Sequence, residues 1–121
     1  MTPDERHRMY RLGVETCAGK VPVHANLPEE TTAEATIAQA RLAVDAGVAA
    51  LHLYTVEGRH GYHPTNRELI GYFDDVLSVI RHPVVIAVNP TMGYIPRPHV
   101  IAEIINRHPT IVGARLSAQP Q

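Results

Sequence analysis

The chain has 121 residues, of which 45% are hydrophobic, so it can bury a substantial core and is not expected to be disordered. Its formal net charge is −1 and its eleven basic residues are spread along the sequence, which argues against a nucleic-acid or membrane-surface partner. The chain has one cysteine, so no internal disulfide is expected. Its charged start lacks a secretory pattern, and no apolar run reaches the ~18 residues that a membrane span needs. We therefore expect a soluble, cytoplasmic protein. Lys20 is the only lysine.

Short β-branched runs alternate with longer helical segments along the chain. A capping threonine, a proline and two acids open the first helix at Thr2, and the helical pattern stops near Ala18. Its expected core-facing residues are Met9, Leu12 and Val14. The later helices are predicted over residues 31–46, 65–81 and 98–107, and the strands over 21–26, 50–55, 84–88 and 110–115.

A helix between each pair of strands predicts βαβ units with right-handed crossovers and a parallel sheet. The pattern alone leaves two α/β architectures open, a doubly wound sheet and a stretch of barrel. A complete (β/α)₈ barrel has eight strands and ~250 residues, so four strands amount to half of one. We expect residues 1–121 to form a single domain with the strands in sequence order and the helices on one face.

Four segments, in order and at matching spacings, resemble the dihydrodipicolinate synthase and N-acetylneuraminate lyase family. They are Gly19-Lys20-Val21-Pro22-Val23 with Thr32-Ala33-Glu34-Ala35, then Asp45-Ala46-Gly47 with Thr55 and Pro64-Thr65, Pro83-Val84-Val85-Ile86 with Asn89-Pro90, and His108-Pro109-Thr110-Ile111-Val112-Gly113. The resemblance implies a partial (β/α)₈ (TIM) barrel, from the second helix to the sixth strand. Three accounts of such a chain are open: a truncated product, a fragment of a longer gene, or a subunit completed by another copy.

The resemblance also implies an activity, carbon–carbon lyase or synthase (aldolase) chemistry on pyruvate-like keto acids. Enzymes of this family form a Schiff base through a lysine on strand six, and a tyrosine on strand five relays protons. Arg115 and Val88 stand at the matching positions, and the family's Thr-Thr loop has no counterpart in this chain. Arginine is a poor nucleophile, and Lys20 precedes its strand and would lie at the opposite end of the sheet. We therefore expect no catalytic residue and no cofactor in this chain, and inactivity when it is alone.

In parallel α/β sheets the functional side chains lie at the carboxyl ends of the strands, and we expect a ring of polar residues at that end of this sheet. The candidate binding residues are His24, Asn26, Glu57, Asn89, Pro90 and Arg115. An arginine can hold a carboxylate bidentately, which suits a keto-acid-like ligand, but Arg115 could instead form a structural ion pair with Glu57. Asn89-Pro90 is both a feature of the family's keto-acid pocket and a common turn former.

Histidines raise a metal site as an alternative, since His60 and His63 are three residues apart and His24 and His52 lie on strands. The intervening Gly61 argues against the helix that such a pair needs, so no metal is predicted.

Three functions stay open: a lyase of this family, a non-catalytic keto-acid-binding or assembly module, and an enzyme that uses Arg115, Glu57 and a histidine without a Schiff base. A homo-oligomer is expected, because the strands at Val21 and Ile111 would each lack a neighbour.

Overall fold

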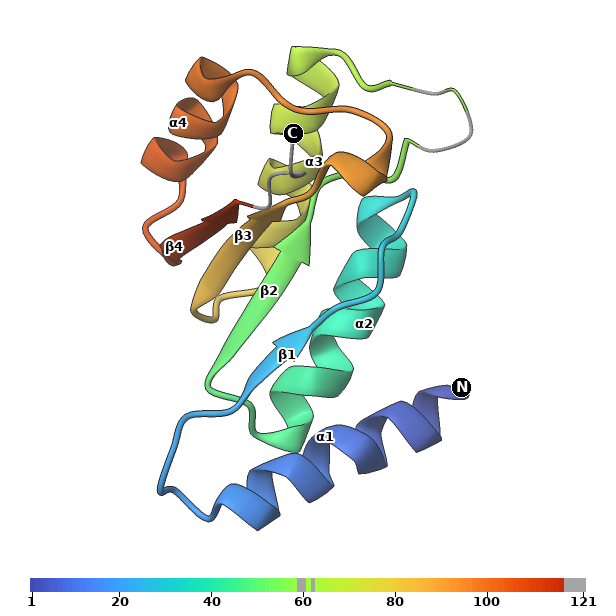
Figure 1. Cartoon of the computed structure of the whole chain (residues 1–121), viewed down its shortest axis with the longest axis vertical. Helices are drawn as coiled ribbons and strands as arrows, with labels where there is room; N and C mark the ends of the chain where they lie inside the picture. Colours follow the sequence, from blue (N-terminus) through green and yellow to red (C-terminus); the bar gives the residue numbers. More distant parts are fainter. Residues whose placement is uncertain (59–60, 62, 117–121) are drawn as a thin grey trace, which may run out of the picture.

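The structure is a computed structural model of the chain, and it describes residues 1–58, 61 and 63–116 (Figure 1). Strands and helices alternate along the described residues. The elements are α1 (Pro3–Cys17), β1 (His24–Asn26), α2 (Ala33–Ala46), β2 (Ala50–Tyr54), α3 (Asn66–Val79), β3 (Val84–Val88), the 3₁₀ helix η1 (Pro90–Met92), α4 (Pro98–Arg107) and β4 (Ile111–Leu116).

Threonines fix the beginnings of three helices. The side chains of Thr2, Thr32 and Thr65 each accept a hydrogen bond from a backbone N–H in the first turn of α1, α2 and α3. At Thr65 the bond is reciprocal, because the Glu68 carboxylate accepts from the threonine's own backbone N–H. Gly47 ends α2 in the left-handed conformation, at a φ of 95°.

The four strands form one parallel sheet in the order β1-β2-β3-β4. This confirms the predicted architecture of parallel strands in sequence order, alternating with helices. β1 is shorter than predicted because Pro22 has no N–H to donate, and the ladder begins only after the Val23 carbonyl accepts from Ala49. Between β3 and β4 the register shifts, so that Val84 lies opposite Ile111 and Val85 opposite Gly113.

The helices pack beside one another in chain order, α1 against α2, α2 against α3 and α3 against α4 (Figure 1). The hydrophobic core lies between these helices and one face of the sheet. Phe73 of α3 is completely buried there against alternate residues of the strands, which are Leu51, Leu53, Val84 and Ile86. The opposite face of the sheet carries polar side chains. We call this face the inner face, because it corresponds to the inside of a barrel.

The prediction for α1 was wrong in part. Val14 packs against the core and Tyr10 is buried in it, but the Met9 side chain is 48% exposed and the Leu12 side chain 65% exposed. Periodicity identified an apolar stripe on the helix, and the core contacts only one side of that stripe. Among the described residues, no helix is both long and apolar enough to cross a membrane.

Candidate functional site

The inner face is built by the alternation of side chains along parallel strands. Residues two apart on a strand share a face, and register partners on neighbouring strands share it too. Asn26 lies opposite His52, and Tyr54 lies opposite Ala87, which in turn lies opposite Arg115. These pairings bring side chains from β1, β2 and β4 onto one surface, although up to 91 positions separate them in the chain.

The Arg115 guanidinium lies over Tyr54. Its Nη2 donates a hydrogen bond of 3.1 Å to the Tyr54 hydroxyl, and its central carbon is 5.8 Å from the centre of the tyrosine ring. Both side chains are half-buried, and the small Ala87 between them leaves room for this contact. Because a guanidinium has five N–H donors in a planar fork, a bond to one phenol fixes its direction and leaves capacity for an anionic ligand.

Two histidines lie beside this pair on the inner face. His24 Nδ1 and His52 Nε2 are 3.0 Å apart, and the two rings are tilted by 50°. Burial lowers the pKa of His52, and the positive charge of Arg115 and the neighbouring His24 lower it further. His52 is therefore neutral at pH 7, and the fixed positive charge on this surface belongs to Arg115.

The structure brings three of the predicted site residues together on the inner face: His24, Asn26 and Arg115. The prediction that His24 lies at the carboxyl end of its strand was wrong. His24 is the first residue of β1 and lies opposite Ala50, the first residue of β2, so it is at the amino end of the sheet. Tyr54 was missed. It is two residues after His52, and this spacing was the signal that places it on the same face.

The remaining predicted residues lie elsewhere. The Val88 side chain is in the core, on the face opposite Arg115, while Ala87 shares the inner face with Arg115. Asn89 and Pro90 form the turn after β3, where their carbonyls accept from Met92 and Gly93. Glu57 is only 8% exposed, in the loop after β2.

Hydrogen bonds join the loops at the carboxyl ends of β1, β2 and β3. Glu57 donates its N–H to the Glu30 carbonyl, Gly58 donates to the Met92 carbonyl, and the Tyr94 hydroxyl donates to the Val56 carbonyl at 2.6 Å. These bonds hold the three loops together beyond the inner face.

Within the part of the chain that the structure describes, no three His, Cys, Asp or Glu side chains are grouped to hold a metal ion. His60 lies outside the described residues, and the His63 ring is 5.8 Å from the Tyr94 ring.

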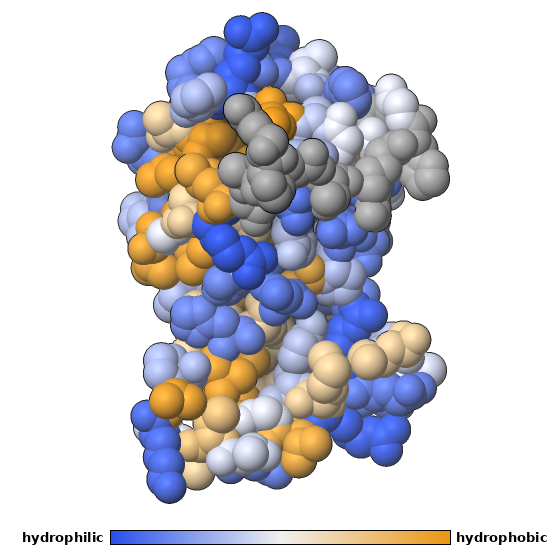
Figure 2. Space-filling model, viewed as in Figure 1, coloured by the Kyte–Doolittle hydropathy of each residue, from blue (hydrophilic) through white to orange (hydrophobic). Residues whose placement is uncertain are grey.

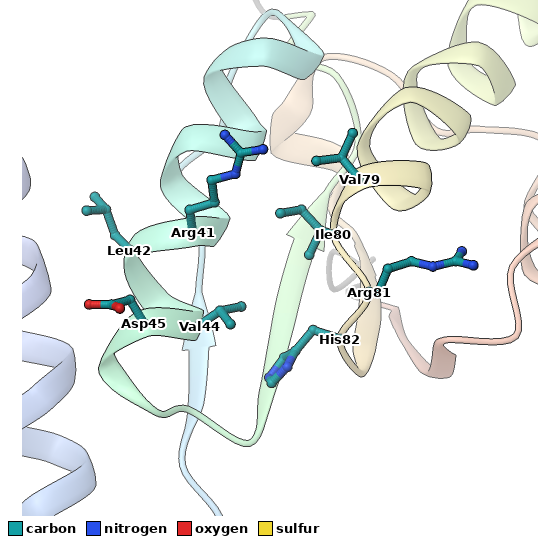
Figure 3. Close-up of a pocket in the computed structure, with 8 residues that line it drawn as sticks. All are labelled: Arg41, Leu42, Val44, Asp45, Val79, Ile80, Arg81 and His82. Atoms are coloured by element: carbon teal, nitrogen blue, oxygen red, sulfur yellow. The ribbon is translucent and has the colours of Figure 1, made fainter.

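Two hollows of similar size lie at different ends of the molecule. One, of about 520 Å³, adjoins the inner face at Asn26 and Tyr54 and is otherwise lined by α1 and by the residues after β1. The other, of about 580 Å³, lies between the ends of α2 and α3, where Figure 3 shows Arg41 and Asp45 on one side and Val79 and His82 on the other. That end of the strands is distant from Arg115, and functional residues of barrels lie at the carboxyl ends, so we favour the first hollow as the site.

No family model matches this sequence. Two similar proteins are both named 4-hydroxy-tetrahydrodipicolinate synthase. The one from Agrobacterium fabrum is 29% identical and the one from Rhizobium meliloti 30% identical, each over 116 residues. The match covers 95% of this chain but 38% of each relative, so the chain spans well under half of their length.

Solved structures show the same arrangement of strands and helices. The 4-hydroxy-tetrahydrodipicolinate synthase of Methylacidiphilum fumariolicum SolV superposes with a TM-score of 0.87 at 16% identity, over 99% of this chain and 39% of that one. YagE, a dihydrodipicolinic acid synthase family protein of E. coli K12 solved in complex with pyruvate, has a TM-score of 0.85 at 21% identity, over 99% and 39%. The fold is therefore part of a TIM barrel, and the resemblance to the dihydrodipicolinate synthase family that the four segments predicted is confirmed over almost the whole of this chain.

Proposed function

We propose that the inner face of this chain binds a small keto acid without forming a covalent bond to it. The observation that carries the proposal is the position of Arg115, whose guanidinium is held over Tyr54 on the inner face. A carboxylate would accept charge-assisted hydrogen bonds from this guanidinium, and such bonds are stronger than those between neutral groups.

The comparisons support a keto acid as the ligand class. The relatives are named as synthases of the dipicolinate type, and one structural neighbour was solved with pyruvate bound. Pyruvate combines one carboxylate with one carbonyl oxygen. The carboxylate suits Arg115, whose hydrogen-bond partner Tyr54 lines the hollow. Asn26 lines the hollow too, and its amide can donate to a carbonyl.

Binding without a Schiff base follows from the residue types. Arg115 stands at the position that the resemblance assigns to the lysine, and an arginine is protonated at every physiological pH and does not form an imine. Lys20 is exposed and lies before β1, near the amino end of the sheet, where its backbone N–H donates to Cys17. The amine is therefore remote from the inner face, so the parent carbon–carbon chemistry is not expected from this chain alone.

Titration with pyruvate, followed by two-dimensional NMR of the ¹⁵N-labelled chain, tests the proposal. We expect pyruvate to shift amides of β2 and β4 around Tyr54 and Arg115. Arg115→Gln should weaken binding about tenfold or more, because a hydrogen bond to a charged group contributes about 1.5–3 kcal/mol.

Two controls separate a specific site from general anion binding. Arg81→Gln removes an exposed arginine near the end of α3 and should leave pyruvate binding unchanged. Methyl pyruvate has the same carbonyl without the carboxylate and should bind much more weakly. Equal binding of the ester, or equal weakening by the two arginine substitutions, would overturn the proposal.

A further inference from the structure

The two outer strands of the sheet each have an unpaired edge. β1 and β4 are the first and last strands of the order β1-β2-β3-β4, and within the described chain neither has a strand on its outer side. Backbone N–H and C=O groups along such an edge are a template for pairing with another strand.

The outer face of β4 is also uncovered, in contrast to the outer faces of β2 and β3. Val112 is 65% exposed and Leu116 is 72% exposed, and they alternate with the inner-face residues Gly113 and Arg115. Figure 2 shows hydrophobic surface on the β4 side of the molecule and again at the end where α1 lies. In a (β/α)₈ barrel a helix covers this face of every strand.

α1 presents a surface of complementary character at the other edge of the sheet. It packs against α2 through Tyr10 and Val14, and the exposed Met9 and Leu12 form an apolar stripe beside that contact. The hollow of about 520 Å³ lies between α1 and the carboxyl end of β1, with Met9 and Leu27 among its lining residues. The hollow is therefore close to the free edge of β1, next to the path that a neighbouring strand would take.

We propose that a second copy of this chain fills both edges, so that two four-stranded arcs close one eight-stranded barrel. β4 of one copy would pair in parallel with β1 of the other, and a two-fold axis along the barrel makes the second contact identical to the first. The arc has the curvature that closure needs, because it superposes on TIM barrels with TM-scores of 0.85 and 0.87. Two copies supply the eight strands at which such a barrel closes.

The same arrangement covers the exposed apolar residues. α1 precedes β1, so in the closed barrel α1 of the second copy would lie over β4 of the first. The N-terminal half of α1 lies near Asn26, at the carboxyl end of the strands, and Arg11 lies near Ala46, at the amino end, so α1 is antiparallel to them. Met9 would then contact Leu116, and Leu12 would contact Val112.

Closure also changes the site, because the inner faces of the two copies would line one cavity. Arg115 of one copy would lie on the strand next to Asn26 of the other, so each half of the cavity would receive a guanidinium from both sides. The two copies would assemble whether or not a keto acid is bound, so the assembly can be tested without a ligand.

The mass of the chain in solution tests the assembly. Light scattering after size exclusion should give twice the 13.3 kDa of one chain at micromolar concentration. Val112→Asp should convert the dimer to a monomer, because it would place a carboxylate under α1 of the second copy. Val79→Asp makes the same change at a position 46% exposed on α3, away from both edges, and should leave the dimer intact.

Cross-linking gives a readout that does not require a stable monomer. In a Cys17→Ser background, Leu12→Cys with Val112→Cys places thiols on α1 and β4, at opposite edges of the sheet in one chain. Oxidation should give a covalent dimer, whereas Leu12→Cys with Val79→Cys should not. A folded monomer, a ladder of larger species in place of a dimer, or equal effects of the two aspartate substitutions would overturn the proposal.

Discussion

Arginine and lysine differ at position 115 in what they can do beside Tyr54. A lysine amine in a partly buried site can lose its proton and attack a carbonyl, whereas the guanidinium stays charged and presents a planar fork of donors. The Tyr54 hydroxyl fixes the guanidinium on the inner face. The positive charge of the guanidinium lowers the pKa of His52 and helps to keep it neutral. The surface is therefore suited to hold an anion and not to attack one.

The lowered pKa of His52 makes the stability of the fold depend on pH. The unfolded chain protonates this histidine near its usual pKa of about 6.5, but the folded chain resists protonation because of burial, Arg115 and His24. Its contribution is fully present above about pH 6.5, and the free energy of unfolding falls as the pH drops below that value.

Urea denaturation of the unaltered chain and of His52→Gln, at pH 7.5 and pH 5.5, measures this effect. The substitution should reduce the loss of stability on acidification, and His99→Gln, at an exposed histidine of α4, should not. Other histidines titrate in both proteins, so the difference between the variants is the quantity to compare. An unchanged or larger loss in His52→Gln would contradict this account of the site.

Strand alternation made part of the site predictable at the level of single residues. His24, Asn26 and Arg115 could be named because they are polar residues assigned to the carboxyl ends of predicted strands, although His24 lies at the amino end. Tyr54 was missed although its spacing from His52 predicts that the two share a face, and the register opposite Ala87 places both on the inner face. The sequence did not show which face of β3 carries the Val88 side chain. The structure places this side chain in the core, and a group there cannot reach a ligand on the inner face.

Between elements, one buried polar contact joins α2 to α3. The hydroxyls of Thr36 and Tyr72 share a hydrogen bond of 2.6 Å, and burial raises the pKa of Tyr72 to about 12. Tyr72→Phe should destabilise the fold by about 1–3 kcal/mol, because it leaves the buried Thr36 hydroxyl without its partner. Thr36→Val in addition should recover part of the loss, as denaturant titration of the four proteins of the double-mutant cycle would show. Strictly additive effects of the two substitutions on the free energy of unfolding would contradict the assignment of a hydrogen bond between Thr36 and Tyr72.

Helix ends and strand runs were predictable because their signals are local. Caps at Thr2, Thr32 and Thr65 are short-range chemistry, and each helix begins directly after them. The orientation of α1 could not be predicted in the same way. Met9 and Leu12 form an apolar stripe, but no surface within the described residues covers it. A periodic pattern shows that a face is apolar, but it does not identify the surface that covers the face.

At the scale of the molecule, the four described strands form an arc of a TIM barrel whose inner face carries polar side chains. The predicted strand order followed from the alternation of strands and helices, and the barrel followed from the resemblance, because the pattern alone left an open sheet equally acceptable. The relatives are more than twice as long as the match, so the chain shares only part of the sequence that their activity is assigned to.

The central claim is that a keto acid at this site forms no covalent bond to the chain, and borohydride trapping tests it most directly. The chain is incubated with pyruvate, reduced with borohydride and weighed intact by mass spectrometry, beside an enzyme known to form a lysine imine with pyruvate. An imine would be reduced to a stable adduct, and we predict an unchanged mass for this chain because Arg115 cannot form one. A reduced pyruvyl adduct on this chain, localised to Lys20 by peptide mapping, would contradict the account.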